Sequence, residues 1–466
     1  MISPHGRATL PGIRDLEVCF RRIDITPDRP VSLLGYFTDR ISEGTLDRLH
    51  CRLAALSLGQ ERLLFVQIDS CLFGRADAER LALAASRSSG IPTERVMVFA
   101  SHTHTAPGLA DMYAVRRDAV YLDFLEAGIS AAASELGPWE RVSVRICRGR
   151  ASGLASNRRW WLENGTVATN PPRMHPALVR PEGPVDDEVN TVAFLAGDGR
   201  VLGLFVSASN HTDTIGGNLV SADWPGIMEA DIRAALGSQP VVVPFIGAAG
   251  NINHFDFARD IDQSSYVEAR RIGRGYASAV LASLERGVEA EGGALRAARR
   301  MISMPGIEIS AAELARARQI LARPAAAASG HDLTAEDLFA GDPGVERIFA
   351  QALLDLAAGR PEAYEVPLQF FRAGGIGFFA IPGEPFVEIG LALKALPGFD
   401  LAIPVGLANG YFGYIPMREN FGRGGYEVKP GPALLCRDAA DRILEAFAEM
   451  TAEGPRLNRA GGTGSA

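Results

Sequence analysis

Strongly apolar segments that stop abruptly at short glycine-rich polar stretches recur along this chain. Clear examples are residues 63–68 (LLFVQI), 201–208 (VLGLFVSA) and 376–381 (IGFFAI). Their length and their content of branched and aromatic side chains are typical of buried strands. Apolar residues at helical spacing follow such segments at about 76–89 and 121–136. Buried strands that alternate with helices indicate an α/β fold, with mixed β-sheets layered with helices.

Side chains suited to catalysis or metal binding stand at the ends of these segments. In chain order they are Asp69, His102, His104, His211, Asn251, Asn253, Glu384, Tyr411 and Tyr414. In layered α/β proteins, sites gather beyond the carboxyl ends of strands, where the backbone turns away and side chains can converge. Asn, Asp and Gly are also common in ordinary turns. Histidines and a glutamate that arrive together in this context nevertheless favour one shared site at the strand ends.

The stretch from Phe99 to Gly108 (FASHTHTAPG) is the most informative of these strand ends. Side chains two residues apart in an extended backbone project to the same face, so His102 and His104 are expected to point the same way. Neutral imidazole binds Zn²⁺ well, and a fixed spacing limits the entropy cost of gathering ligands. An ordinary hydrogen-bonded pair of histidines fits the motif equally well. The metal hypothesis therefore depends on ligands from elsewhere in the chain.

The composition describes a globular protein without a nucleic-acid surface. Of the 466 residues 47% are hydrophobic, enough for a substantial core, and the net charge of −8 argues against nucleic-acid binding. No apolar run is long enough to span a bilayer, and the N-terminus lacks the apolar core of a signal peptide. The five cysteines form no CxxC pair, as expected for buried residues in a reducing compartment. We therefore expect a cytoplasmic protein with no transmembrane segment.

The chain shows no internal repeat and no clear interdomain linker. We therefore expect one large domain over residues 1–453. Within it, the interval of about 305–365 is mostly helical in pattern and is expected to form a helical insertion or side layer. Residues 454–466 are small and polar, which predicts a disordered tail. The sequence Asp223-Trp-Pro-Gly226 predicts a helix start with Asp223 as its N-cap.

Taken together, these motifs resemble the catalytic domain of the neutral (non-lysosomal) ceramidase family, over most of the chain from Asp24 to about Val428. The motifs that carry the resemblance are residues 101–108 (SHTHTAPG), 157–158 (NR), 210–213 (NHTD), 219–223 (LVSAD), 247–253 (GAAGNIN), 382–384 (PGE) and 409–414 (NGYFGY), with Tyr426. No single motif is decisive, but their order and spacing make the set fairly specific. The resemblance implies a hydrolase of the N-acyl amide bond, the bond cleaved in ceramide during sphingolipid metabolism.

The resemblance also implies the roles of individual residues. The implied ligands of Zn²⁺ are His102, His211, Glu384 and Tyr414. His104 is implied as the acid/base beside the metal, and Arg158 and Tyr426 as the groups that meet the substrate carbonyl. Zn²⁺ lowers the pKa of its bound water from about 15.7 to around 7. A positioned acid/base contributes about 10²–10⁴ in rate, and one oxyanion donor about 3–4 kcal/mol.

Two features depart from the family pattern. The family's Gly-Asp-Val-Ser-Pro-Asn segment appears here as residues 250–255 (GNINHF), so Asn253 stands where the site serine would be. An amide can hydrogen-bond a water or a carbonyl but cannot act as a nucleophile, and Asn253 is expected in that polar role. We also expect no C-terminal immunoglobulin-like domain. Together with the absence of a signal peptide, this favours an amide substrate other than ceramide, and a more polar one.

Two further classes of function stay open at this point. One is a metal-dependent lyase or glycosidic-bond-cleaving enzyme on a hydroxyl-rich substrate, because Asn251 and Asn253 replace the serine motif. The other is a non-catalytic protein that binds a metal or a partner, which the presence of His104, Arg158 and Tyr426 disfavours. Co²⁺, Ni²⁺ or Mn²⁺ would also accept a mixed nitrogen and oxygen shell. Asp69 and Asp213 are candidates to orient the ligand histidines, and Asp69 equally to cap a turn.

Overall fold

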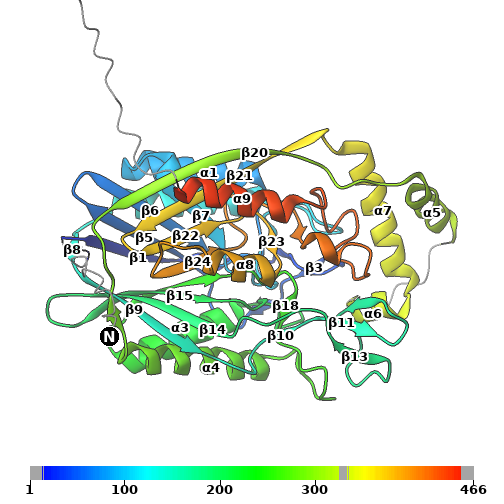
Figure 1. Ribbon diagram of the computed structural model, residues 1–466, viewed down its shortest axis with the longest axis horizontal. Helices are drawn as coiled ribbons and strands as arrows, with labels where there is room; N and C mark the ends of the chain where they lie inside the picture. The colour runs from blue at the N-terminus through cyan, green and yellow to red at the C-terminus, as the bar shows by residue number, and fades with distance from the viewer. Residues whose placement is uncertain (1–12, 14, 325–332, 334, 453–466) are drawn as a thin grey trace, which may run out of the picture.

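The computed structural model describes residues 13, 15–324, 333 and 335–452 (Figure 1). Three larger β-sheets and the helices that cover them form the framework of this part of the chain. The predicted architecture, mixed β-sheets layered with helices, is therefore confirmed. Residues 454–466, predicted to be a disordered tail, lie outside the described residues. In the part that is described, no helix has both the length and the apolar character needed to cross a membrane.

The first sheet has the strand order β7–β6–β5–β1–β8. Its strands are β1 (Glu17–Asp24), β5 (His50–Leu58), β6 (Glu61–Ile68), β7 (Val96–Ala100) and β8 (Glu140–Arg141). Helices α1 (Arg75–Ser89) and α2 (Ala119–Ser134) pack on its outer face through a cluster of buried Leu, Ile, Val and Ala side chains. Neighbouring strands are antiparallel, except that β6 and β7 are parallel. Helix α1 forms the crossover between these two strands.

The second and third sheets are built in the same way. The second consists, in spatial order, of β17 (Val241–Ile246), β15 (Val201–Ala208), β14 (Glu188–Leu195), β9 (Ser143–Arg150) and β19 (Val288–Glu289), with helices α3 (Asp223–Leu236) and α4 (Tyr266–Leu284). The third consists of β20 (Leu295–Pro305), β21 (Ala363–Ala373), β22 (Ile376–Ala380) and β24 (Leu401–Val405), with helices α8 (Val387–Lys394) and α9 (Ala439–Ala452). Each sheet thus carries two helices on its outer face.

One topological unit occurs in all three sheets. Two antiparallel strands are followed by a helix and by a strand that lies parallel to the second one. The units are β5–β6–α1–β7, β14–β15–α3–β17 and β21–β22–α8–β24. The sequence shows no matching repeat, so the recurrence is one of topology. Residues that follow these strands supply the candidate site described below.

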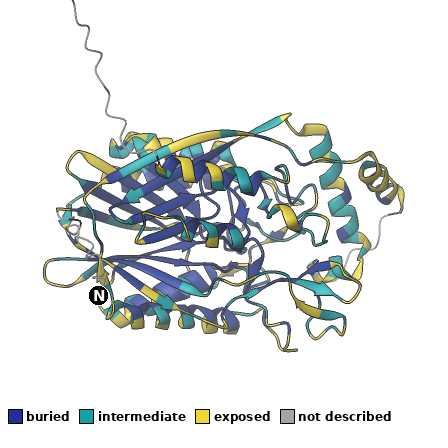
Figure 2. Ribbon diagram, in the orientation of Figure 1, coloured by how far each residue is buried: buried dark blue, intermediate teal, exposed yellow. Residues whose placement is uncertain are grey.

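The inner faces of the three sheets meet in one aromatic core. The ring of Phe65 in β6 lies 5.1 Å from that of Phe205 in β15 and 4.8 Å from that of Phe378 in β22, measured between centroids. All three side chains are buried, and Figure 2 shows that buried residues are concentrated in the strands. Because densely packed rings from three sheets interlock here, the core fixes the sheets, and hence their strand ends, relative to one another.

A helical layer separates β20 from β21 in the chain. It comprises α5 (Ala311–Ala322), α6 (Ala335–Ala340) and α7 (Pro343–Gly359), and it lies at one end of the molecule in Figure 1. Ser310 and Glu313 form a capping box at the start of α5, and Asp342 caps α7 ahead of Pro343. These local signals account for the positions at which α5 and α7 begin.

The remaining elements are short. They are β2 (Ser32–Leu33), β3 (Arg40–Ile41), β4 (Gly44–Thr45), β10 (Ser156–Asn157), β11 (Arg159–Leu162), β12 (Val167–Thr169), β13 (Leu178–Pro181), β16 (Leu219–Val220), β18 (Ile252–Asn253), β23 (Glu384–Pro385), β25 (Tyr414–Ile415) and the 3₁₀ turns η1 (Thr93–Arg95) and η2 (Arg418–Asn420). Several of them pair across long sequence distances, for example β10 with β18 and β23 with β25.

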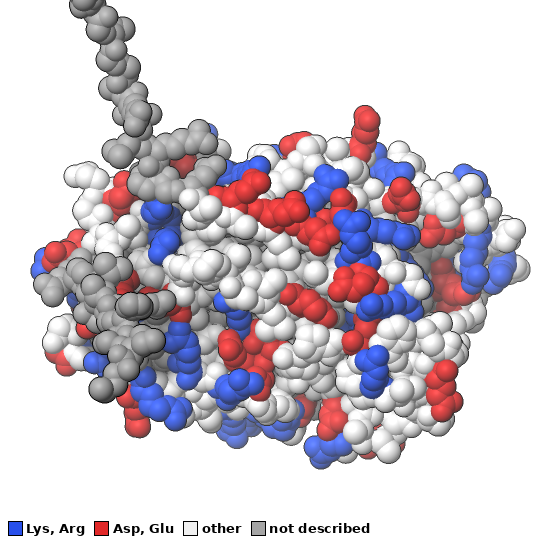
Figure 3. All heavy atoms as spheres, in the orientation of Figure 1, with Lys and Arg blue, Asp and Glu red and all other residues white. Residues whose placement is uncertain are grey.

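On the face shown in Figure 3, acidic and basic side chains are interspersed. The five cysteines form no disulfide.

The start of α3 differs from the prediction. Its N-cap is Ala222, and Asp223 is the first helical residue, with a φ of +56°. The Asp223 carboxylate accepts hydrogen bonds from the backbone N–H groups of Thr214 (2.8 Å) and Ile215 (3.1 Å). Its oxygens are therefore engaged by the preceding loop, and Asp223 fixes the segment that follows β15.

Candidate metal centre

Three side chains, one from each sheet, converge beyond the strand ends. His102 follows β7, His211 follows β15, and Glu384 follows β22 as the first residue of β23. His102 Nε2 lies 3.1 Å from His211 Nε2, and Glu384 Oε2 lies 3.3 Å from each of these nitrogens. All three side chains are buried. The structure thus brings together three of the four residues expected to bind a metal.

The other ring nitrogen of each histidine fixes the orientation of the ring. His102 Nδ1 lies 2.9 Å from the carbonyl oxygen of Cys71, and His211 Nδ1 lies 3.0 Å from that of Ala249. A carbonyl oxygen can only accept, so each Nδ1 carries a hydrogen, and the lone pair of the neutral ring is then on Nε2. Metal-binding histidines commonly have such backbone partners. Both lone pairs consequently face the position of the Glu384 carboxylate.

This convergence calls for a positive charge. Burial opposes a proton on His102, but Glu384 and Cys71 together outweigh burial and raise the pKa of His102 well above its usual value. Burial and the positive charge of Arg158 lower the pKa of His211 well below its usual value. Glu384 Oε2 nevertheless has no hydrogen-bond partner among the described residues, although it is buried. A proton on His102 therefore does not satisfy this oxygen, and an unpaired buried carboxylate is costly.

A metal ion fits the same space. Tetrahedral coordination with bonds of about 2.0–2.2 Å separates the ligand atoms by about 3.3–3.5 Å. The separations between His102 Nε2, His211 Nε2 and Glu384 Oε2 are 3.1–3.3 Å. These three residues therefore form a group that could hold a metal ion. The backbone of His102 has a φ of +67°, a strained value for a residue with a side chain, as often occurs at functional sites.

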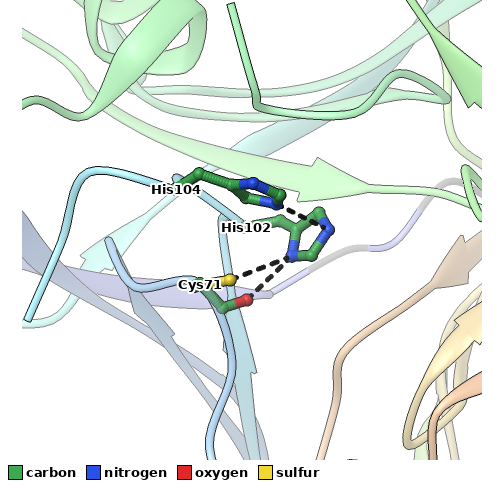
Figure 4. Close-up of side chains that lie close together, drawn as sticks. All are labelled: Cys71, His102 and His104. Carbon is green, nitrogen blue, oxygen red and sulfur yellow. Dashed lines mark hydrogen bonds between the residues drawn. The ribbon is translucent and has the colours of Figure 1, made fainter. Parts of the chain in front are cut away.

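Cys71 adds a second group with the same histidines (Figure 4). Its Sγ lies 3.8 Å from His102 Nδ1, and Cys71, His102 and His104 together could also hold a metal ion. Burial raises the pKa of Cys71, but His104 and His102 outweigh it and lower the pKa to about 7. His102 Nδ1 already donates to the Cys71 carbonyl, so its free lone pair favours the group with His211 and Glu384. Sequence analysis missed Cys71 because no partner lies near it in the chain.

His104 stands beside the candidate centre. Its Nε2 lies 3.4 Å from His102 Nε2, and its Nδ1 lies 3.4 Å from Asp213 Oδ1. Burial lowers the pKa of His104 below its ordinary value, which favours the neutral ring that can accept a proton. This position is compatible with the acid/base role expected from the sequence.

Arg158 reaches the centre from the chain between β10 and β11. Its Nη1 lies 3.3 Å from His211 Nε2, and its Nη2 donates to the carbonyl oxygen of Gly250 at 2.7 Å. Glu427 binds the Arg158 guanidinium from the opposite side, with its Oε1 3.2 Å from Arg158 Nε. The second oxygen of Glu427, Oε2, lies 2.7 Å from Nη1 of the neighbouring Arg159. Glu427 is fully buried and anchors both guanidinium groups. Sequence analysis missed it because only its position beside Tyr426 could have drawn attention to it.

Three tyrosines surround Glu384, and the one that bonds it is not the one expected as a ligand. The Tyr411 hydroxyl donates to Glu384 Oε1 at 2.8 Å. The Tyr414 hydroxyl lies 3.4 Å from that of Tyr426, and a bond from Tyr414 to a metal stays a prediction. The Arg158 guanidinium lies 5.3 and 5.6 Å from the ring centroids of Tyr414 and Tyr426, within reach of a cation–π contact.

Asn253 is turned away from the other candidate residues. Its Nδ2 donates to Asn170 Oδ1 at 2.6 Å, and its Oδ1 accepts from the backbone N–H of Phe255 at 3.1 Å. Within the described part of the chain Asn170 lines the cavity and Asn253 does not. Asn253 therefore influences the cavity through Asn170, and its direct catalytic role stays a prediction.

The candidate centre opens into a cavity of about 680 Å³. The predicted site residues that line it are His102, His104, Arg158, His211, Glu384, Tyr414 and Tyr426. The remaining wall is largely apolar and aromatic, with contributions from Phe37, Met112, Tyr113, Phe255, Leu333 and Leu356. Helix α7 of the helical layer supplies part of this wall. Convergent polar groups in an apolar cavity of this size are typical of a small-molecule site.

Comparison with known proteins identifies the fold. No protein-family model matches the chain, and no curated protein matches its sequence. The crystal structure of neutral ceramidase from Pseudomonas aeruginosa superposes with a TM-score of 0.72 at 17% identity, covering 94% of this chain and 74% of that chain. A ceramidase complexed with C2 gives a TM-score of 0.69 at 17% identity, covering 94% and 75%. The resemblance inferred from the sequence motifs is thus confirmed in three dimensions, and the chain has the neutral ceramidase fold.

Proposed function

We propose that this protein is a zinc-dependent hydrolase that cleaves an N-acyl amide bond. The observation that carries the proposal is the convergence of His102 Nε2, His211 Nε2 and Glu384 Oε2 within 3.3 Å of one another, on a cavity that also holds His104, Arg158 and Tyr426. The similarity to neutral ceramidase supports the type of bond, because a ceramidase hydrolyses an amide.

Zinc is proposed on the chemistry of the donors. Two imidazole nitrogens and one carboxylate oxygen are a common protein shell of catalytic zinc, which keeps a further position open. When bound, Zn²⁺ lowers the pKa of a coordinated water from about 15.7 to around 7 and polarises a carbonyl group. Tyr414, which lines the same cavity, is the proposed fourth protein ligand. Co²⁺, Ni²⁺ and Mn²⁺ accept similar donors, so the identity of the bound metal is to be established by the metal analysis described below.

The remaining polar residues have complementary roles in this proposal. His104 accepts a proton from the attacking water at Nε2 and returns it to the leaving amine, a contribution of about 10²–10⁴ in rate. Arg158 and Tyr426 donate to the carbonyl oxygen as it becomes negative. Arg158 is suited to this role because Glu427 and the Gly250 carbonyl hold its guanidinium in place.

The walls of the cavity bear on the substrate. Their apolar and aromatic side chains suit an acyl group. Arg117 and Asp77, which form an ion pair of 2.6 Å, and Arg173 add polar character, in line with an amide more polar than ceramide. The alternative of a hydroxyl-rich substrate was motivated by Asn251 and Asn253. Both amides are engaged within the protein, Asn251 by Glu388 and the Val387 N–H, so hydrolysis is the function we retain.

Metal analysis combined with turnover tests this proposal. Protein loaded with zinc and freed of excess metal is expected to hold one Zn²⁺ per chain by mass spectrometry of the metal. It is expected to hydrolyse members of a panel that runs from N-acylsphingosines to N-acyl amino acids, with one solvent ¹⁸O in the acid product. His102→Ala should abolish both properties, whereas the control His175→Ala, outside the cavity, should keep both. Turnover without metal, or products without solvent oxygen, would overturn the proposal.

A further inference from the structure

We propose that Asp213 is the positioning residue for His104, and that its carboxylate selects the tautomer of the ring in which Nε2 can accept a proton. The inference rests on the proposed function for the role of His104. It adds the residue that gives the ring its orientation and tautomer, which neither the metal ligands nor the oxyanion donors provide.

The two nitrogens of His104 face opposite sides. Nε2 lies 3.4 Å from His102 Nε2, on the side of the candidate centre, and Nδ1 lies 3.4 Å from Asp213 Oδ1. Nδ1 is buried and has no hydrogen-bond partner among the described residues, and the Asp213 carboxylate lies 3.4 Å from it as an acceptor that could complete it. A small closure of this distance gives the bond, as apo sites often show long contacts of this kind. A carboxylate at Nδ1 favours the Nδ1–H tautomer.

The surroundings hold His104 against this carboxylate. A Cβ atom on Gly35 would lie 2.4 Å from His104 Cγ and 2.7 Å from its Nδ1, so only glycine leaves room for the ring there. The neighbouring Tyr36 hydroxyl donates to Asp213 Oδ1 at 2.9 Å. Arg40 donates to the backbone oxygen of His104 at 2.5 Å and lies over the Tyr36 ring at 3.9 Å. One short segment, residues 35–40, therefore shapes both the ring pocket and the carboxylate.

Asp213 is held from its own side as well. Asp223 binds the backbone N–H groups of Thr214 and Ile215, and the Trp224 indole N–H donates to the carbonyl oxygen of His211 at 2.9 Å. The backbone N–H of His104 also donates to the carbonyl oxygen of Thr212 at 3.3 Å. The loop with Asp213 and the loop with His104 are therefore joined directly and anchored on α3. Such double anchoring is what a positioning role requires.

The chemistry that follows is the orientation of a general base. With the hydrogen on Nδ1 directed to Asp213, the lone pair of Nε2 faces the cavity, and the proton it accepts from the attacking water makes an imidazolium that Asp213 stabilises. The arrangement corresponds to the aspartate and histidine of serine-hydrolase triads. An asparagine at position 213 can donate its amide hydrogen to Nδ1 of His104. The ring hydrogen then moves to Nε2, and Nε2 no longer has a lone pair that can accept a proton.

Kinetics of the zinc-loaded protein give the first test. Asp213→Asn is expected to keep one zinc per chain and a KM within about threefold, while kcat falls by about 10- to 100-fold. The control Asp47→Asn changes the same functional group nearby, where Asp47 binds Ser221 Oγ and the Ala222 N–H, and should leave kcat unchanged. If Asp213→Asn does not fold, Tyr36→Phe takes its place, with an expected loss of about two- to tenfold in kcat. An undiminished kcat in the folded variant overturns the proposal.

Nuclear magnetic resonance of the metal-free protein gives a test without turnover. Long-range ¹H–¹⁵N correlation of labelled histidines, assigned with His104→Ala, is expected to show the hydrogen of neutral His104 on Nδ1. In Asp213→Asn it should move toward Nε2, whereas Asp47→Asn should leave it unchanged. Identical tautomers in the wild type and Asp213→Asn would overturn the positioning role. If the wild type hydrolyses no amide, the proposed function fails, and this measurement still decides the role of Asp213.

Discussion

The ends of β6 and β15 occupy the same place in two of the repeated units, yet they differ in what their aspartates do. Asp69 follows β6 and Asp213 follows soon after β15, and both were candidates to orient ligand histidines. Asp69 Oδ1 lies 2.8 Å from Arg52 Nη1, and Asp69 Oδ2 accepts the backbone N–H of His50 at 2.8 Å. Asp213 instead lines the cavity and contacts His104 and Tyr36.

The two aspartates differ in function because different side chains lie beside them. Arg52 of β5 is fully buried and also bonds Glu229 of α3, so Asp69 belongs to an ion-pair network that joins the first two sheets. Burial raises the pKa of Asp69, but Arg52 and His50 together outweigh burial, and the pKa is lowered. Asp213 faces an imidazole instead of a guanidinium, and burial raises its pKa. The end of β6 therefore stabilises the fold, and the end of β15 serves the site.

The largest effect is expected at the end of β15. His211→Ala removes one of the three converging donors and should abolish zinc binding, with a loss of at least about 10³-fold in kcat/KM because several kcal/mol of transition-state stabilisation depend on the metal. The fold should persist, since the change lies outside the aromatic core. Metal content, kcat/KM and the circular dichroism spectrum measure these outcomes. A variant that keeps zinc and full turnover would remove His211 from the site.

The opposite pattern is expected at the end of β6. Asp69→Ala leaves the buried Arg52 with only Glu229 as an anionic partner, which should lower the free energy of unfolding by about 3 kcal/mol. Since total stabilities are about 5–15 kcal/mol, urea unfolding resolves this change easily. The folded variant should keep its zinc and its kcat. If Asp69→Ala lost zinc at unchanged stability, the two strand ends would not differ in function.

The residues on this site that follow apolar strands could be predicted from the sequence. The segment 201–208 coincides with β15, and 63–68 with all but the first two residues of β6, because buried strands have an unmistakably apolar pattern. His102, His211 and Glu384 come shortly after such strands, which end at Ala100, Ala208 and Ala380, and their convergence follows from the general position of sites in α/β folds. The fold resemblance rested on the order of these same strand-end motifs, and the solved ceramidase structures confirm it.

The partners supplied by distant parts of the chain could not be predicted. Arg52 and Glu229 are 177 positions apart, and nothing in the local pattern of β5 indicates that its arginine reaches α3. Glu427 holds Arg158 across an even longer sequence distance, and the hydroxyl of Tyr411, not that of Tyr414, donates to Glu384. These choices depend on side-chain direction in the folded state, which a motif does not encode.

A smaller effect is expected from Tyr426, which belongs to the cavity but not to the converging donors. Tyr426→Phe removes only the hydroxyl, so kcat should fall by about 10²-fold through the loss of one oxyanion donor. Zinc content should be unchanged, and the free energy of unfolding should change by less than about 1 kcal/mol. Steady-state kinetics of zinc-loaded protein measure the loss, with Tyr121→Phe, away from the cavity, as the matched control. A loss of zinc in Tyr426→Phe would instead assign Tyr426 to the metal shell.

The smallest effect concerns pH and the network at the end of β6. Burial and then the charge of Arg52 lower the pKa of His50 from 6.5 to about 4. Between these two values the unfolded chain binds a proton that the folded protein does not, so the free energy of unfolding falls as the pH falls from 6.5 to about 4. Asp47 acts in the opposite direction, because burial raises its pKa to about 6 and favours the folded state as it gains a proton.

His50→Gln isolates the histidine contribution from that of Asp47. Between pH 7 and pH 5 the wild type is expected to lose about 1 kcal/mol more than His50→Gln, because only the wild type has to keep a buried histidine neutral in the folded state. Urea unfolding at the two pH values measures the difference, and His175→Gln, away from Arg52, is the control. Equal losses in the wild type and His50→Gln would show that the end of β6 accommodates a charged His50. Burial around Arg52 would then not exclude a proton from His50. The ends of β6 and β15 would differ only in the side chains that their aspartates contact.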